Sequence, residues 1–463
     1  MSSNMTETAE APMQAFGCRL NAMGGGILND IWDTPKVLRE MLAKYKVGEA
    51  IVFPSLRRPL PSSHGLAGVS PLEIMNACTI GALGVIGNKF TIVGCGTSFH
   101  ASLFAEYLVE TIARIPVEVQ YASEFRCRTP IMNDGDVFIV VSNSGETIDA
   151  VESIRLVRRS KSGAKVLVVA VVNQTNSTIA RESDVVIEAM AGEEAGVAST
   201  KAFCASCLAF VLLAVMLGEA CGTIEQAERD TLLQNIEELP DQVQAVLDRE
   251  SKPLWQTQKM QRCETPLKRG ECILWDIGCQ NVLAQNFIFL GRGVNFPIAL
   301  EGAMKCKEIA YIHAEGYPAA EMKHGPIALI DVFMPVVFIA PQSDPTYAKI
   351  KANIEEVKTR NGAIIVITEE HNTDLEDLCE YVIHVPPTHE YLMPLISIIP
   401  LQLLAFMMGI LRGNEVDNPR GLTKSVKHDS APLAEDRVTN GDRDNKNPED
   451  LPQGGRGAYP TPN

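Results

Sequence analysis

Serine and threonine hydroxyls gather where an apolar run of the sequence ends. The run reads Val140-Val-Ser-Asn-Ser-Gly-Glu-Thr147, and residues 148–153 have a helix-like composition. Several hydroxyls beside the free N–H groups of a helix start can surround one anion. The alternative is an ordinary strand-to-helix turn whose serines only cap the helix. Because the same strand–loop–helix theme recurs along the chain, we interpret this segment as a phosphate-binding loop.

Three charged residues occupy helix-like spacing further along the chain. Glu301, Lys305 and Glu308 lie at positions i, i+4 and i+7, which places them on one helix face. The simplest interpretation is a solvated charged stripe. The flanking residues 296–300 and 309–312 are apolar, however, which favours a face that looks into a protected cleft. A carboxylate beside a lysine could there act as a tuned proton carrier.

A histidine and a lysine lie in turn-rich segments. His324 precedes Gly325-Pro326, which halts regular structure and leaves the imidazole on a loop. Lys424 follows a turn-rich segment at residues 417–423. An isolated histidine is more often structural, and a lysine is by default on the surface. A lysine enclosed against a site could instead lose its proton and attack a carbonyl to form an imine.

The elements that would position these residues come from an internal repeat. Residues 94–99 (GCGTSF) match residues 291–296 (GRGVNF), and residues 122–126 match residues 319–323, both at an offset of 197 residues. Residues 163–169 and 184–187 match later segments at nearly the same offset. The chain therefore carries a duplicated α/β unit. The first unit has Cys95 at the position where the second has Arg292. This difference fits a division in which the first unit binds phosphate and the second supplies proton chemistry.

Short β-branched runs alternate with helical segments in each unit. In the first unit the runs cover residues 90–93, 137–141, 166–172 and 185–187. This alternation predicts an α/β fold with two tandem, doubly wound parallel sheets. Ligands of such sheets lie beyond the carboxyl ends of the strands, where residues 94–98 and 142–147 fall.

The expected domain organisation follows from these patterns. Residues 223–262 suggest helices interrupted by Pro240, and the stretch at 263–280 is unassigned and could be an insertion. The tail has almost no aliphatic side chains, so it cannot offset its ordering entropy by burial. The expected parts are an N-terminal extension (1–27), a helical lead-in (28–81), the first unit (82–222), a helical linker (223–282), the second unit (283–412), a C-terminal segment (413–427) and a disordered tail (428–463).

Composition restricts the kinds of partner. The chain has 463 residues, 46% of them hydrophobic, and a formal net charge of −16, which makes a nucleic-acid partner improbable. The N-terminus has no apolar segment of a secretory signal. The apolar run at 208–217 has about half of the ~20 residues that span a bilayer, so we expect a buried helix. We expect a cytoplasmic protein that binds neither membrane nor nucleic acid.

Cysteine usage agrees with a reducing compartment. The twelve cysteines are scattered, many of them in apolar stretches, as expected for reduced core thiols. Cys204 and Cys207 form a CxxC pair, but no second pair follows at zinc-ligand spacing and the segment has the pattern of a helix interior. We expect no metal and no cofactor.

Taken together, these strings closely resemble the isomerase half of glutamine:fructose-6-phosphate amidotransferase, a family with two sugar-isomerase (SIS) domains. The resemblance covers roughly residues 28–427. The segments that carry it are 95–98 (CGTS), 142–147 (SNSGET), 196–203 (GVASTKAF), 290–293 (LGRG), 301–308, 311–315 (YIHAE), 323–326 (KHGP) and 417–426.

The resemblance implies roles for individual residues. The catalytic set would be Glu308 as the base that moves a proton between C1 and C2, His324 in ring opening, Lys424 in imine formation, and Lys305 and Glu301 in support. His324 would reach into the site of the neighbouring subunit of a homodimer. The sugar-phosphate contacts would come from Ser142, Asn143, Ser144 and Thr147 around the phosphate, and from Thr97, Ser98, Val197, Ser199, Arg420 and Thr423.

The sequence departs from the family in three places. Ser2 and Ser3 follow Met1, and the first cysteine is Cys18, so the glutaminase domain with its N-terminal cysteine nucleophile is expected to be missing. Asn143 stands for the usual glutamine, and Gly421 for an asparagine. These two changes bear on the substrate's identity and on closure of the site.

The resemblance leads us to expect isomerising amination of fructose-6-phosphate to glucosamine-6-phosphate. Ammonia would come from solution or from a separate glutaminase. Two alternatives stay open. One is the reverse reaction of a glucosamine-6-phosphate deaminase, and the other is a sugar-phosphate-binding regulator without turnover.

Overall fold

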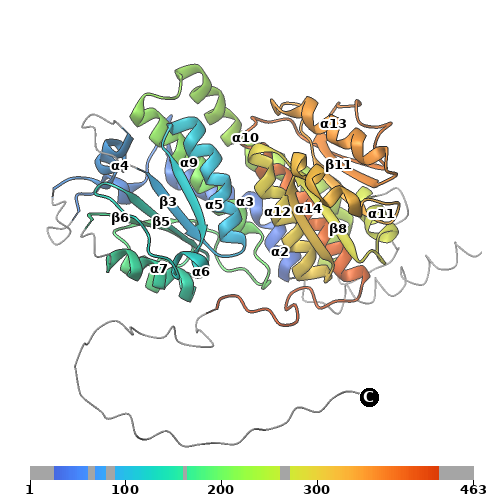
Figure 1. Cartoon of the computed structure of the whole chain (residues 1–463), viewed down its shortest axis with the longest axis horizontal. Coiled ribbons are helices and arrows are strands. Elements are labelled where there is room, and N and C mark those ends of the chain that lie inside the picture. Colours follow the sequence, from blue (N-terminus) through green and yellow to red (C-terminus); the bar gives the residue numbers. More distant parts are fainter. Residues whose placement is uncertain (1–25, 61–67, 80–88, 160–163, 261–271, 427–463) are drawn as a thin grey trace, which may run out of the picture. The chain divides into compact units, whose positions relative to one another are not determined.

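Two five-stranded parallel sheets organise the computed structural model, which describes residues 26–60, 68–79, 89–159, 164–260 and 272–426 (Figure 1). The first sheet has the strand order β4-β3-β5-β6-β7, and the second has β9-β8-β10-β11-β12. Numbered within each unit, both orders are 2-1-3-4-5, which is a doubly wound arrangement. The duplicated α/β fold expected from the sequence is confirmed. The expectations for most of the N-terminal extension, for residues 263–271 of the unassigned stretch and for the tail fall outside the described residues. The remainder of that stretch after Cys272 forms the helix α11 (Ile273–Gln280).

The strands of the sheets are short and closely match the apolar runs. Those of the first sheet are β3 (Phe90–Gly94), β4 (Val117–Tyr121), β5 (Val137–Ser142), β6 (Leu167–Val172) and β7 (Val185–Glu188). Those of the second are β8 (Asn286–Gly291), β9 (His313–Pro318), β10 (Pro335–Ile339), β11 (Ala363–Glu369) and β12 (Tyr381–Val385). A small antiparallel pair, β1 (Lys46–Val47) and β2 (Ala50–Ile51), precedes them.

Helices lead into the sheets, connect their strands and join the two units. The α-helices are α2 (Gly26–Trp32), α3 (Thr34–Tyr45), α4 (Pro71–Thr79), α5 (Thr97–Leu108), α6 (Ala122–Phe125), α7 (Ile148–Arg158), α8 (Thr178–Glu182), α9 (Lys201–Cys221), α10 (Gln226–Met260), α11 (Ile273–Gln280), α12 (Phe296–Lys305), α13 (Tyr347–Lys358) and α14 (Met393–Leu411). Shorter turns are η1 (Pro54–Arg57), η3 (Val109–Ala113), η4 (Gly293–Asn295), η5 (Cys306–Ala310), η6 (Ala319–His324) and η7 (Pro326–Leu329).

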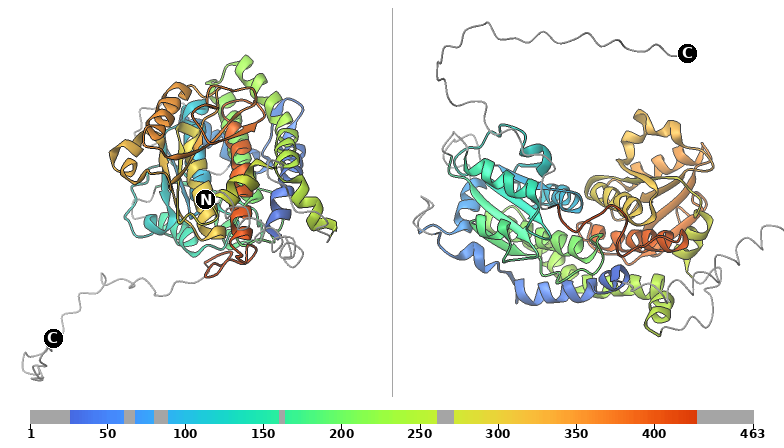
Figure 2. Two further views of the ribbon diagram at one scale, coloured as in Figure 1. Left: turned by 90° about the vertical axis from the view of Figure 1, so that its right-hand side faces the viewer. Right: turned by 90° about the horizontal axis from the view of Figure 1, so that it is seen from below.

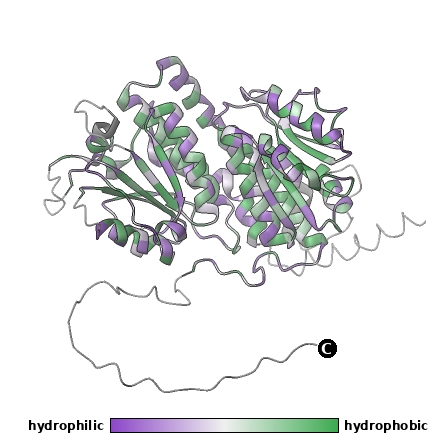
Figure 3. Ribbon diagram, in the orientation of Figure 1, coloured by the Kyte–Doolittle hydropathy of each residue, from purple (hydrophilic) through white to green (hydrophobic). Residues whose placement is uncertain are grey.

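Alternating strand residues pack into different cores, as the two-residue period of a strand requires. In β5, Ile139 and Val141 join a large core that is continuous through both units, whereas Phe138 and Val140 join a smaller core with α6, α7 and α8. The second sheet likewise has an outer core with α13. Figure 3 shows the sheets and the helices between them as mainly hydrophobic, with polar residues on the outer helices.

The helical linker differs from its expected form. α10 runs without a break from Gln226 to Met260, and Pro240 is a buried residue inside it. The prediction of an interruption at Pro240 is therefore wrong. A proline inside a helix removes one backbone hydrogen bond. Here α10 packs along α3 and α14, and tertiary packing of this kind outweighs local preference.

Two helices are long and apolar enough to cross a membrane by length and composition alone. They are α9 and α14, and 89% and 94% of their most apolar windows are buried inside the protein. Such burial is typical of core helices, so neither helix is a convincing membrane span. The predicted buried helix at 208–217 lies within α9, which is confirmed as a core helix.

The C-terminal segment returns from the second unit to the first (Figure 2). It leaves the end of α14, and the N–H of Val197 donates to the Asp417 carbonyl at 2.9 Å. Further along, the N–H of Ile148 donates to the Val426 carbonyl at 3.0 Å. Lys424 is thereby held next to the first sheet although it follows the last helix of the second unit.

Candidate active site

A cavity of about 750 Å³ lies at the carboxyl ends of the first sheet's strands. Residues after β3, β5, β6 and β7 and at the start of α9 form most of its wall. Met304 and Glu308 of the second unit and residues 422–426 of the C-terminal segment complete it. Eleven of the residues singled out from the sequence line it. They are Thr97, Ser98, Ser142, Asn143, Ser144, Thr147, Val197, Ser199, Glu308, Thr423 and Lys424.

The hydroxyl loop (residues 142–147) is ordered by its own side chains. Ser142 Oγ accepts the N–H of Gly145 at 3.1 Å and lies 3.1 Å from Thr147 Oγ1. Ser144 Oγ accepts the N–H of Glu146. Thr147 is the N-cap residue of α7, but its side chain makes no capping bond. The interpretation of these hydroxyls as mere helix caps therefore fails at Thr147.

One of the helix N–H groups expected to face the anion has another partner. The N–H of Ile148, at the first position of α7, donates to the Val426 carbonyl. The C-terminal segment thus occupies one donor at the helix start. The side-chain hydroxyls of the loop and the dipole of α7 are what the structure offers directly to an anion in the cavity.

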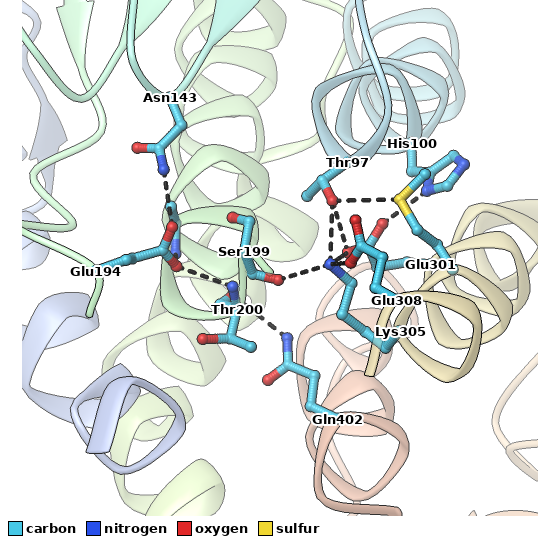
Figure 4. Close-up of polar contacts among 12 residues, drawn as sticks. Thr97, His100, Asn143, Glu194, Ser199, Thr200, Glu301, Lys305, Glu308 and Gln402 are labelled. Atoms are coloured by element: carbon cyan, nitrogen blue, oxygen red, sulfur yellow. Dashed lines mark hydrogen bonds and ion pairs between the residues drawn. The ribbon is translucent and has the colours of Figure 1, made fainter. Parts of the chain in front are cut away.

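A buried charge network lies behind the cavity wall (Figure 4). Lys305 Nζ lies 3.2 Å from Glu301 Oε1 and 2.6 Å from Glu308 Oε2. Lys305 and Glu301 have fully buried side chains, whereas the side chain of Glu308 is 23% exposed and lines the cavity. Glu301, Lys305 and Glu308 thus lie on one face, as predicted. Glu308 itself lies in η5, a π-helical turn that continues α12.

Two residues of α5 complete this network from the first unit. Thr97 Oγ1 donates to Glu301 Oε1 at 2.9 Å, and His100 Nδ1 lies 2.6 Å from Glu301 Oε2. Burial alone would raise the pKa of Glu301, but the positive charge of Lys305 and the contact with His100 outweigh it and lower that pKa to about 2. Burial opposes the charge on Lys305, yet Glu301 and Glu308 raise its pKa. Glu301 and Lys305 are therefore held in their charged forms.

Lys424 lines the cavity from the C-terminal segment. Its Nζ donates to the main-chain carbonyl of Glu194. Lys424 and Glu308 thus line one cavity, although one belongs to the C-terminal segment and the other to the second unit.

Four of the expected residues do not line this cavity: Glu301 and Lys305, which lie behind its wall, and His324 and Arg420. His324 ends the short helix η6 and is exposed, rather than lying on an irregular loop. The guanidinium of Arg420 lies over the ring of Tyr311, with Cζ 4.4 Å from the ring centroid, and the Arg420 N–H donates to the Tyr311 hydroxyl. Neither residue touches the hydroxyl loop of its own chain in any contact that the structure shows.

The loop after β10 in the second unit corresponds to the hydroxyl loop, and its own carboxylate accepts hydrogen bonds there. Asp344 follows β10 and accepts from the N–H and the hydroxyl of Thr346, at 2.6 and 2.7 Å. It also accepts from Asn295 Nδ2 at 3.0 Å. A carboxylate before α13 thus satisfies donors of the kind that an anion would need, which agrees with the expected division between the units.

Sequence reasoning missed two buried residues of the site. Glu194 lines the cavity and His100 contacts Glu301. Glu194 follows another acidic residue, a pattern typical of a surface, and His100 is a single histidine in an apolar helix. The side-chain partners Asn143 of Glu194 and Glu301 of His100 are 51 and 201 residues away in sequence, so no local spacing marks these contacts. Among the described residues, no group of three or more His, Cys, Asp or Glu side chains could hold a metal ion.

Comparison with known proteins agrees with this architecture. Glutamine–fructose-6-phosphate aminotransferase (isomerizing) from Chlorobaculum tepidum is 48% identical over 338 residues, which are 73% of this chain and 51% of that protein. The protein of the same name from Thermus thermophilus is 43% identical over 339 residues, again 73% of this chain and 52% of that protein. The chain therefore spans about half the length of the curated relatives it matches.

Solved structures give the same picture. The C-terminal domain of glucosamine-fructose-6-phosphate aminotransferase from Francisella tularensis superposes with a TM-score of 0.71 at 29% identity, over 85% of this chain and 97% of that one. A glucosamine-6-phosphate deaminase from Thermotoga maritima shares the fold, with a TM-score of 0.60 at 18% identity over 87% of this chain and 99% of that one. The SIS domain model matches residues 87–216 and 283–412, more than half of the chain. The protein thus belongs to the SIS-domain family and carries two copies of the domain.

Proposed function

We propose that the chain catalyses the isomerising amination of fructose-6-phosphate to glucosamine-6-phosphate through an open-chain imine. The observation that carries the proposal is the shared cavity. A hydroxyl loop suited to phosphate, a lysine and a carboxylate line the same space. The names of the relatives supply the substrate, and the cavity supplies groups for each chemical step.

The proposed chemistry begins at the open-chain ketose. The unprotonated amine of Lys424 attacks the C2 carbonyl, and the oxygen leaves as water to give an imine. Ammonia displaces the lysine at C2 and leaves a protonated imine (C=NH2+) at that carbon. Glu308 then takes a proton from C1, a proton is returned to C2, and the C1 hydroxyl loses its proton, which gives an aldehyde at C1 and an amine at C2. The hydroxyl loop would hold the phosphate throughout.

Lys305 has a supporting role in this scheme. It lies 2.6 Å from Glu308 Oε2 and 3.0 Å from the Ser199 carbonyl. Its positive charge thus lies directly beside the carboxylate of Glu308. Glu301 balances this charge from the buried side.

The proposal includes a homodimer in which His324 assists ring opening in the partner's cavity. In its own chain His324 is exposed and lies outside the cavity wall. The segment that follows it exposes Leu329, Val332 and Phe333, the last with 83% of its surface exposed. Apolar side chains exposed next to a functional residue favour a covering partner.

Ammonia would come from solution or from a separate glutaminase, and we place the enzyme in the cytoplasm. Cys95, Cys204 and Cys306 are free thiols. Burial raises the pKa of Cys95 to about 11 and that of Cys306 to about 12. Protonated, reduced thiols of this kind suit a reducing compartment.

The first test is an assay of the purified chain with fructose-6-phosphate and either ammonium or glutamine. We expect glucosamine-6-phosphate with ammonium alone. Formation of product from glutamine without a second protein would overturn the proposed ammonia source. Release of ammonia from glucosamine-6-phosphate, without detectable synthesis, would assign the deaminase direction. Tight sugar-phosphate binding with neither reaction would assign a regulator.

The second test addresses the catalytic groups. Borohydride reduction in the presence of fructose-6-phosphate should attach the sugar to Lys424, as found by peptide mapping. Glu308→Gln should keep this trapping but lower turnover at least about a hundredfold, since it removes only the proton carrier. Unchanged turnover in Glu308→Gln would refute the assigned base.

A further inference from the structure

Glu194 joins three parts of the cavity that are distant in sequence. Its Oε1 accepts the N–H groups of Thr200 and Ala202, at 2.8 and 3.1 Å, where α9 begins. Its Oε2 accepts from Asn143 Nδ2 of the hydroxyl loop at 2.8 Å. Its main-chain carbonyl accepts from the ammonium of Lys424. Figure 4 shows the contacts of the Glu194 carboxylate with Asn143 and with Thr200, which together form a continuous chain.

The carboxylate of Glu194 is held in an unfavourable environment. The residue is only 6% exposed, and burial raises its pKa. The contacts that stabilise its charged form are amide and main-chain N–H groups, with Lys305 acting only at longer range. A buried carboxylate is costly unless its hydrogen bonds are complete, so loss of any one partner should disturb its position.

Asn143 is oriented by this carboxylate. Asn143 Nδ2 donates to Glu194 Oε2, so the amide nitrogen of Asn143 faces Glu194. The amide oxygen Oδ1 is then buried and has no hydrogen-bond partner among the described residues. Asn143 therefore links the hydroxyl loop to Glu194 by a single bond with a fixed direction.

The same stretch of chain also reaches the base. Five residues after Glu194, the Ser199 carbonyl accepts from Lys305 Nζ at 3.0 Å, and Lys305 contacts Glu308 at 2.6 Å. Residues 194–199 thus contact Lys424 directly and reach Glu308 through Lys305. A shift of this stretch would move Lys424 and Glu308 together.

We infer that Glu194 is a positioning residue that couples phosphate binding to the placement of Lys424. A phosphate in the hydroxyl loop fixes Asn143, Asn143 fixes the carboxylate of Glu194, and the Glu194 carbonyl then holds Lys424 within reach of C2. Glu194 itself touches neither the phosphate nor the reacting carbon. This inference rests on the proposed function, because it assigns Lys424 as the amine that attacks the sugar.

The experiment measures borohydride trapping of fructose-6-phosphate at Lys424 as a function of sugar concentration. Glu194→Ala and Asn143→Ala should each lower the trapping rate at saturating sugar by about tenfold, the loss expected for one hydrogen bond to a charged group. The double variant should be no slower than the slower single variant, because both act through one contact. If the variants changed only the sugar concentration at half-saturation and not the trapping rate at saturation, the inference would be overturned. Losses of trapping rate that add up in the double variant would also overturn it.

A conservative variant separates positioning from general damage. Glu194→Gln keeps an oxygen for the two N–H groups of α9, and Asn143 can turn its amide to present Oδ1 to the new amide nitrogen. We therefore expect Glu194→Gln to recover most of the trapping rate. If the negative charge of Glu194 were itself required, Glu194→Gln would not recover the trapping rate. Asn143→Ala leaves the bonds at α9 intact, so it keeps the test valid if Glu194→Ala fails to fold.

Two controls complete the design. Asn176→Ala and Glu376→Gln make the same chemical changes at exposed positions outside the cavity wall and should trap like the unaltered protein. If the unaltered protein traps no sugar at Lys424, the proposed function fails. If it traps sugar and the Glu194 and Asn143 variants do so equally fast, only the present inference fails.

Discussion

Lys305 shows how burial turns a common charge pattern into a functional one. The pair Glu301 and Lys305 has the same i, i+4 spacing as Lys36 and Glu40 on α3. The first pair has no exposed surface, whereas the side chains of the second are 72% and 51% exposed. Solvent screens an exposed pair, so its contribution to stability is small. Breaking a buried pair leaves an uncompensated charge and costs far more.

This contrast gives a prediction about stability and pH. The pKa of Glu301 is lowered from 4.5 to about 2, so its charged form stabilises the fold above pH 4.5, and this contribution is lost as the pH falls from 4.5 toward 2. Glu301→Gln should lower the free energy of unfolding near pH 7 by about 3 kcal/mol. Because the unaltered protein loses the same contribution in acid, the difference should shrink at lower pH.

Urea unfolding at about pH 7, 4 and 3 measures this difference above the window in which Glu301 binds its proton and at two points within it. Glu40→Gln is the matched control and should change the free energy of unfolding by less than about 0.5 kcal/mol at each pH. A gap between Glu301→Gln and the unaltered protein that stayed constant with pH would contradict the assignment of Glu301 as the ionised partner.

At the residue scale, spacing reveals neighbours on one helix and little more. The shared face of Glu301, Lys305 and Glu308 could be predicted because all three lie within two helical turns. His100 and Glu194 could not, since their contacts are with Glu301 and Asn143, which are separated from them by many residues. Packing of the two units brings His100 to Glu301, and the fold of the first unit brings Glu194 to Asn143.

At the scale of elements, the close approach of two segments shapes the hydroxyl loop. Gly145 has φ of +65°, and a Cβ placed on it would lie 2.0 Å from Ser177 Oγ, at the start of α8. Left-handed backbone costs a residue with a Cβ roughly 1–2 kcal/mol before any clash is counted. The loop can therefore take this form only with glycine at this position.

Gly145→Ala should consequently displace the hydroxyl loop and weaken phosphate binding. We expect the KM for fructose-6-phosphate to rise by at least about tenfold, because the loop would no longer converge on one anion. Ser177→Gly added to it removes the clashing Oγ and Cβ, and glycine is tolerated at a helix N-cap. Partial recovery of KM in the double variant would show that the clash matters. No recovery, with a normal fold, would mean that backbone strain alone accounts for the loss.

The elements themselves could be predicted to different degrees. The central strands were visible as buried apolar runs, and β5 and β6 are buried along their whole length. The strand β4, at a sheet edge, was not visible, because its residues Val117 to Gln120 are only half-buried. Its counterpart β9 lies at the corresponding edge. The opposite edge strand β7 keeps alternating buried residues and was predicted from residues 185–187, so position at an edge does not by itself remove the apolar signal.

At the scale of the whole molecule, the proposed base depends on contact between the two units. Thr97 and His100 of α5 in the first unit both contact Glu301 of α12 in the second. Lys305 in turn reaches the Ser199 carbonyl of the first unit. The sequence predicted two units and a cavity at the end of the first sheet. It contained no signal for this joint network, because polar contacts between units have no period along the chain.

The proposed exchange of His324 between subunits predicts complementation. His324→Ala and Glu308→Gln should each lower turnover strongly when present alone. In a mixed dimer, the subunit that keeps Glu308 receives an intact His324 from its partner, so one of the two sites is complete. Random mixing makes about half of the dimers mixed, so about one quarter of the unaltered activity should return.

Unfolding and refolding the two variants together, or co-expressing them with different affinity tags, provides the mixed dimers. Turnover of the dimer purified through both tags should be about half that of the unaltered protein, since one of its two sites is complete. A His324 that served its own chain would leave no complete site in any combination, and turnover would then stay at the level of the single variants. Because His324 lies outside the cavity wall of its own chain, the structure favours the shared arrangement.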